Sequence, residues 1–244
     1  MTQGESAPVR RRIEEAPGAP ADIWFARGAV LVIVALQFLF VNEVTILPRW
    51  VMPTLELALL LPLSVATVWT LGVERKRAAG EIEGDLWIRL ARRRRMIHTA
   101  FFLLTALVSV ANLFALAGLV HEIMHGHANS GKSLLADALN IWATNVIIFS
   151  LWYWNLDKKL PGAPSEAGPH FIFTQQTVPV SFTRRIRAPG YIDYLFLAFT
   201  NATAFSPSDT FPLTPRAKLL MMTEAIISLV TIVLVAARAV GMLA

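Results

Sequence analysis

Cysteine is absent from this chain of 244 residues, and charged residues make up only 16% of it. Without cysteine the chain can form neither disulfide bonds nor metal sites built on thiolates. The shortage of charge accompanies a hydrophobic fraction of 55% and a mean hydropathy of +0.53, too apolar for an ordinary soluble domain. The sequence therefore predicts an integral membrane protein.

Long apolar stretches contain most of the hydrophobic residues. A helix of about 20 residues is long enough to cross a bilayer core about 30 Å thick. Stretches of this kind lie at residues 28–47, 51–73, 96–119, 134–156 and 218–244. We expect an all-α integral membrane fold with five transmembrane helices and, as argued below, a short re-entrant half-helix.

These stretches divide the chain into four regions. The N-terminal part is rich in proline and acidic residues, and no small-residue cleavage site follows it, so it predicts a disordered tail and not a signal peptide. The expected regions are a cytoplasmic tail at 1–22, a four-span region at 23–156 with a basic cytoplasmic loop at 74–95, a polar cytoplasmic loop at 157–190, and a pore-like region at 191–244.

Basic residues are distributed unevenly around the expected spans. Arginines at 10–12 precede the first span and a basic segment at 75–95 precedes the third, whereas the loops on the other side offer only Arg49 and Lys132. Cytoplasmic loops carry the excess of lysine and arginine. This pattern predicts a multi-pass membrane protein with a cytoplasmic N-terminus.

The basic segment at 75–95 predicts contact with anionic lipid head groups, in addition to the bilayer itself. Its apolar positions could face lipid while its arginines meet the head groups, as in an interfacial helix; these positions are Ile82, Leu86, Trp87 and Leu90. Because a cluster that sets topology explains the arginine run, we expect no nucleic-acid partner.

The outer loop HEIMHGHANSGKS, residues 121–133, matches two motifs. Its second half fits the phosphate-loop pattern, but that motif requires a strand before the glycine-rich loop, and here a membrane helix precedes it. We expect no nucleotide. Its first half places His121 and His125 one helical turn apart, where they could share zinc while Glu122 acts as general base.

A third zinc ligand would have to come from another outer position, and the candidates are Glu43, Glu56 and Asp137. The alternative functions are therefore a membrane-embedded zinc metalloprotease, with zinc as cofactor, or an ordinary histidine-rich loop. The leading expectation includes neither a cofactor nor a catalytic residue.

Residues 191–205 are apolar but too short to span a bilayer comfortably, which predicts a re-entrant half-helix. A polar turn follows, and Thr214-Pro215 is typical of the start of a helix. The oxygen-bearing and acidic side chains of this region predict a cation path, and they are Thr200, Asn201, Thr203, Ser206, Ser208, Asp209, Thr210 and Glu224.

This region resembles the C-terminal part of an uncharacterised family of bacterial inner-membrane proteins. The shared pattern is D-Y-x-x-x-(A/S)-F-T…F-x-x-(S/T)-D-T, matched here from Asp193 to Thr210, followed by a basic residue and a long helix. More distantly, it is similar to the pore helix, loop and inner helix of potassium channels. The glycine-containing filter is missing, so the resemblance does not imply potassium selectivity.

The resemblance and the polar residues together predict an ion-channel-like or transport-related protein. A homo-oligomer is expected, because one such loop cannot enclose an axial pore. The runner-up classes are the zinc metalloprotease and a non-catalytic membrane scaffold or accessory subunit.

Overall fold

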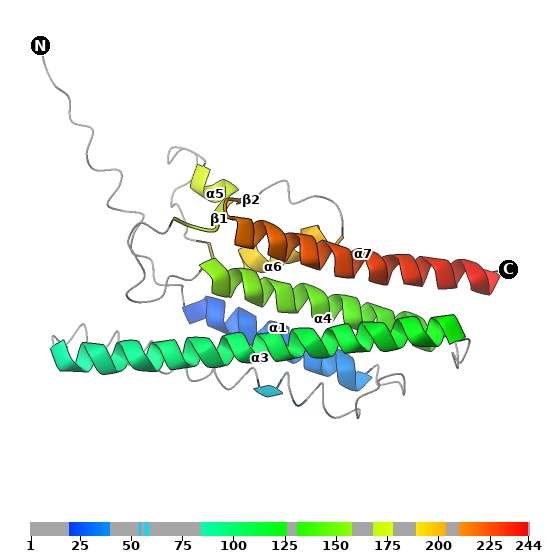
Figure 1. The fold of residues 1–244 in the computed structure, drawn as a ribbon, viewed down its shortest axis with the longest axis horizontal. Coiled ribbons are helices and arrows are strands. Elements are labelled where there is room, and N and C mark those ends of the chain that lie inside the picture. The colour runs from blue at the N-terminus through cyan, green and yellow to red at the C-terminus, as the bar shows by residue number, and fades with distance from the viewer. Residues whose placement is uncertain are drawn as a thin grey trace, which may run out of the picture.

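The computed structural model describes residues 20–39, 54, 57–58, 84–125, 131–157, 168–177, 189–203 and 210–243. This part of the chain is mostly helical, with one short pair of strands (Figure 1). The elements are α1 (Pro20–Leu39), α3 (Gly84–His125), α4 (Gly131–Asp157), β1 (Phe171–Phe173), α5 (Thr174–Thr177), α6 (Tyr191–Ala202), β2 (Thr210–Pro212) and α7 (Pro215–Leu243).

Helix α4 lies at the centre of the bundle. It packs against α1, α3, α6 and α7, and the long helices α3, α4 and α7 run alongside one another (Figure 1). From Thr144 to Asn155 every residue of α4 is buried except the half-buried Trp152. This stretch includes the polar residues Asn145, Ser150 and Asn155, and polar side chains in a membrane span face the interior of the bundle, which explains the central position of α4.

Within the described residues, three helical segments are long and apolar enough to cross a membrane: Arg95–Met124, Leu134–Asp157 and Pro215–Ala237. They correspond to three of the five expected spans. Helix α1 begins at Pro20, earlier than the expected first span, and covers it as far as Leu39. The remainder of that span and most of the second, at 51–73, lie outside the described residues.

Helix α7 exposes large apolar side chains and buries several polar ones, which is the reverse of an amphipathic helix in a soluble protein. Its outer face carries large apolar side chains such as Leu219, Ile226 and Leu229, each more than half exposed. Its buried stripe follows helical spacing and becomes polar along the chain: Ala217, Met221, Glu224, Ser228 and Thr231. Apolar side chains facing outwards suit lipid as the surrounding solvent.

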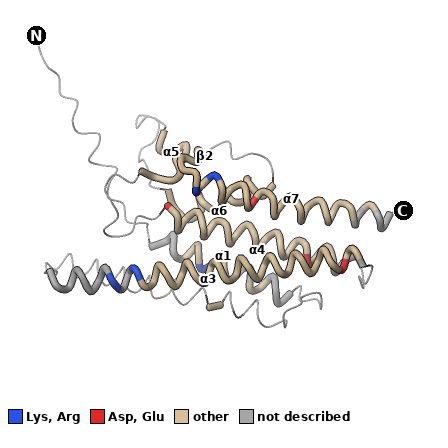
Figure 2. The backbone as a smooth tube through the Cα atoms, viewed as in Figure 1, with Lys and Arg blue, Asp and Glu red and all other residues tan. Residues whose placement is uncertain are grey.

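Helix α3 extends well beyond its apolar segment. Residues 84–94 continue the same helix before the membrane-compatible part begins at Arg95, and this end projects past the neighbouring helices (Figure 1). Figure 2 shows basic residues at this end of α3 and acidic residues towards the opposite end of the bundle. The sequence predicts a basic loop at 74–95, whereas residues 84–94 are helical and continuous with the apolar segment.

The expected polar loop at 157–190 contains the first strand. Strand β1 pairs antiparallel with β2, with Phe171 opposite Pro212 and Phe173 opposite Thr210. Strand β2 begins at Thr210, the last of the expected path residues before the final helix. Phe171 and Phe173 are buried, so β1 presents two rings to the helices.

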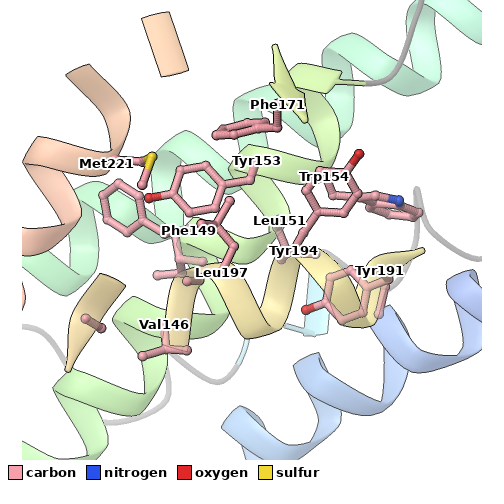
Figure 3. Packing of buried hydrophobic residues seen from close by; sticks show 14 of the residues in the cluster. Val146, Phe149, Leu151, Tyr153, Trp154, Phe171, Tyr191, Tyr194, Leu197 and Met221 are labelled. Atoms are coloured by element: carbon pink, nitrogen blue, oxygen red, sulfur yellow. The ribbon is translucent and has the colours of Figure 1, made fainter. Parts of the chain in front are cut away.

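Aromatic residues of β1, α4 and α6 pack against one another, and Figure 3 shows Phe171, Tyr153 and Tyr194 among them. The ring of Phe173 meets that of Tyr194 edge-on at 5.0 Å, and Phe171 meets Tyr153 at 5.3 Å. Such edge-to-face pairs add about 0.5–1.5 kcal/mol each beyond simple burial. They join β1 to α4 and α6, and so help to position α6 beside α7.

Candidate functional site: a buried carboxyl between three helices

Glu224 is the centre of the candidate site. It lies on the buried stripe of α7, and none of its surface is exposed. It also falls inside the segment Pro215–Ala237, which is long and apolar enough to cross a membrane. An acidic residue in such a segment is costly to bury and marks a functional position by default.

Two other helices supply hydrogen bonds to the same oxygen of Glu224. The hydroxyl of Tyr153, on α4, donates to Oε2. The side-chain amide of Asn201, on α6, donates to Oε2 at 2.7 Å. The site therefore joins residues that are far apart in the sequence, and it depends on the packing of α4, α6 and α7.

The orientation of the Asn201 amide is determined by its neighbours. Besides Glu224 Oε2, its nitrogen bonds the backbone oxygen of Met221 at 2.9 Å. Both partners are acceptors, so the NH₂ group and not the amide oxygen must face them. A third contact, to the Tyr153 hydroxyl at 3.4 Å, is the longest of the three. Asn201 thus presents two donors to α7.

The other oxygen of Glu224 has a different environment. Oε1 is buried, and no group among the described residues forms a hydrogen bond with it. Both donors at Oε2 are neutral. An ionised carboxylate with a bare buried oxygen and no cationic partner is strongly disfavoured. The arrangement is suited to binding a positively charged species or a proton.

A second polar contact lies one helical turn further along α7. Asn145 of α4 donates to the Ser228 hydroxyl at 2.8 Å, and both side chains are buried. Asn112 of α3 reaches the backbone oxygen of Ile141 at 3.4 Å. Ser228 therefore lies between two other buried polar residues of the same α7 stripe, Glu224 and Thr231.

The expected path residues separate into four groups. Asn201 and Glu224 meet, as just described. Thr200 and Thr203 are in contact with their own helix, because their hydroxyls bond the backbone oxygens of Phe196 and Phe199 at 2.9 Å. Thr210 is buried in β2 opposite Phe173. Ser206, Ser208 and Asp209 lie outside the described residues.

Tyr153 is the site residue that the sequence did not indicate. The sequence alone favours an interfacial aromatic belt for the consecutive residues Trp152, Tyr153 and Trp154. The structure corrects this interpretation, because Tyr153 is fully buried and Trp154 is only 6% exposed. Its role depends on contact with a residue 71 positions later, and no local pattern signals such a partner.

The HEIMH segment is helical, as the zinc hypothesis requires. Helix α3 continues to His125, with His121 exposed and Glu122 half-buried near its end. Across the described ranges no cluster of three histidine, cysteine, aspartate or glutamate side chains could hold a metal ion. Two expected third ligands, Glu43 and Glu56, lie outside those ranges, so the zinc site stays a prediction.

The phosphate-loop match lacks its structural context. The element before the loop is the helix α3, and α4 begins at Gly131 within the motif itself. A phosphate loop follows a strand, and a helix precedes this one; the expectation of no nucleotide stays a prediction.

A second polar cluster connects the ends of α4, α6 and α7. Asp157 accepts hydrogen bonds of 2.7 Å from the His170 backbone and from the Tyr194 hydroxyl. His170 Nδ1 lies 2.7 Å from Oγ1 of Thr214, which also caps α7 by accepting from Ala217. Because Asp157 contacts the backbone of His170 and not its ring, this cluster is not a Thr-His-Asp catalytic triad.

Comparison with protein-family models, with curated proteins and with solved structures found no match. The buried carboxyl and its contacts therefore provide the guide to function.

Proposed function

We propose that this chain is a multi-pass membrane protein that transports a cation, with Glu224 as its ion-binding group. The observation that carries the proposal is the complete burial of Glu224 inside a membrane-compatible helix, where Tyr153 and Asn201 hold it from two other helices. A purely structural contact between helices needs only a neutral polar residue, so a carboxyl at this position points to an ion.

The polarity of the helix faces supports insertion in a bilayer. Large apolar residues of α3 and α7 face outwards, while Asn145, Ser228 and Glu224 face the interior of the bundle. We propose five spans with α6 as a re-entrant half-helix, in the bacterial cytoplasmic membrane, with a cytoplasmic N-terminus. The basic end of α3 would then meet anionic lipid head groups, and a homo-oligomer would enclose the path.

Reconstitution tests the proposal directly. Purified protein in proteoliposomes should take up sodium, potassium or protons, as followed with isotopes and with an internal pH-sensitive dye. Glu224→Gln should lower that flux at least about tenfold, because a neutral amide cannot exchange an ion. Thr223→Ala is the matched control, since its exposed hydroxyl bonds only the backbone of its own helix.

Each outcome bears on a separate part of the proposal. Wild-type protein that carries none of the three cations would refute transport. Wild-type flux that persists in Glu224→Gln would show that the ion binds elsewhere. Asp209→Ala tests whether the polar turn expected at residues 206–210 (SPSDT) lines the path. Loss of flux in this variant would assign the turn to the same path as Glu224.

A further inference from the structure

The two oxygens of Glu224 differ in their contacts. Oε2 accepts from Tyr153 and Asn201, whereas Oε1 is buried with no hydrogen bond from any described residue. Tyr153 is the titratable group that faces Glu224 from α4, and Asn201 faces it from α6. Both are neutral, so among the described residues no hydrogen-bond partner of this carboxyl balances a negative charge.

The same contacts are unsuited to a metal ion. Sodium, potassium and other hard cations are held by several oxygen ligands that replace their hydration shell. Asn201 presents nitrogen to the site, and its amide cannot turn round without losing the bond to Met221 O. Among the described residues, the other oxygens in these contacts are the Tyr153 hydroxyl and the Met221 backbone oxygen, and both already take part in hydrogen bonds.

We infer that the cation bound at Glu224 is a proton, carried on Oε1 while Tyr153 and Asn201 hold Oε2. The inference rests on the proposed function and specifies its ion. A protonated Glu224 is neutral, which removes the cost of a buried charge. The two hydrogen bonds at Oε2 stabilise the carboxylate that forms on release, so the carboxyl can exist in both states.

The exchange step involves one proton only. On release, the O–H bond at Oε1 breaks, its electron pair stays on the carboxyl, and the proton passes to water. The negative charge then spreads over both oxygens, and Oε2 keeps its two donors. Uptake is the reverse of this step and needs no other reactant.

A hydrophobic carbodiimide tests the state of this carboxyl without any measurement of transport. N,N′-dicyclohexylcarbodiimide reacts with a protonated carboxyl: the O–H adds across one C=N bond, and an acyl shift from oxygen to nitrogen gives a stable N-acylurea. Peptide mass spectrometry locates the product. At neutral pH an exposed glutamate, with a pKa of about 4.3, is ionised and reacts little.

We expect modification at Glu224 at neutral pH, slower modification at alkaline pH, and none at this position in Glu224→Gln. Tyr153→Phe removes a hydrogen-bond donor that stabilises the carboxylate form of Glu224. At alkaline pH, Glu224 in this variant should therefore be modified about tenfold faster than in wild type. Tyr191→Phe is the matched control, because this buried tyrosine bonds Ser150 at 2.8 Å and not Glu224.

An unmodified Glu224, or equal rates in Tyr153→Phe and wild type, would overturn the inference. Protection by sodium or potassium, compared with choline at equal ionic strength, would also overturn it and would assign a metal cation instead. Failure of the proposed transport function can be told apart from failure of the proton inference. A modified Glu224 in a protein without flux leaves the proton site intact, whereas flux without modification leaves transport intact and excludes the proton.

Discussion

The side-chain amide of Asn145 on α4 donates a 2.8 Å hydrogen bond to the hydroxyl of Ser228 on α7, and both side chains are buried. This bond lies one helical turn from Glu224 and fixes the register between the two helices that carry Tyr153 and Glu224. Its strength therefore affects the geometry of the carboxyl site as well as the stability of the bundle.

Asn145→Ala and Ser228→Ala should each lower the free energy of unfolding, and a double-mutant cycle should give a coupling of about 1 kcal/mol, as for hydrogen bonds between helices in membranes. The free energy is measured by denaturant titration in mixed micelles. Thr223→Ala, which removes an exposed hydroxyl from the same helix, should change it by less than about 0.5 kcal/mol. A coupling near zero would contradict the assigned bond.

Asp157→Ala should lower the melting temperature more than Tyr194→Phe. Removing the carboxylate breaks two hydrogen bonds, from the His170 amide and from the Tyr194 hydroxyl, and a hydrogen bond to a charged group contributes about 1.5–3 kcal/mol. Tyr194→Phe removes one bond only and leaves the other in place. Thermal unfolding followed by tryptophan fluorescence tests the order, and equal melting temperatures for the two variants would refute the joint role of Asp157.

Ile226→Lys should prevent stable membrane insertion, while Leu219→Lys should be tolerated better. Both residues are about 60% exposed on α7, but Ile226 lies nearer the middle of the membrane-compatible segment. A lysine at the centre of a span costs about 2.5–3.5 kcal/mol, and near an end its long side chain can reach the head groups. Carbonate extraction of membranes measures the difference; equal behaviour of the two variants would argue against lipid at this face.

Several of these features follow from the sequence alone. The length and apolar character of residues 96–119, 134–156 and 218–244 locate three long helices, because few other structures accommodate such runs. Thr214-Pro215 marks the start of α7, since a threonine cap before proline favours that position. Glu224 is also identifiable, because a carboxyl inside an apolar stretch is costly and therefore informative.

The partners of Glu224 could not be predicted in the same way. Tyr153 is an aromatic residue at the end of an apolar run, and such residues occur both in cores and at membrane interfaces. Which of the two applies depends on how α4 packs against α7, and that contact is long-range. The pairing of Phe173 with Thr210 is equally non-local, and strands of three residues carry too few side chains to show a period.

The absence of cysteine makes the orientation of α3 directly testable. Arg92 and Met124 are both exposed, near opposite ends of this helix, and single-cysteine variants at either position carry no background thiol. If the basic end is cytoplasmic, a membrane-impermeant maleimide should label Met124→Cys in intact spheroplasts, and should label Arg92→Cys only after permeabilisation. Labelling is read by gel shift or mass spectrometry. The reverse pattern would invert the proposed topology, and labelling of both variants in intact spheroplasts would mean that α3 does not cross the membrane.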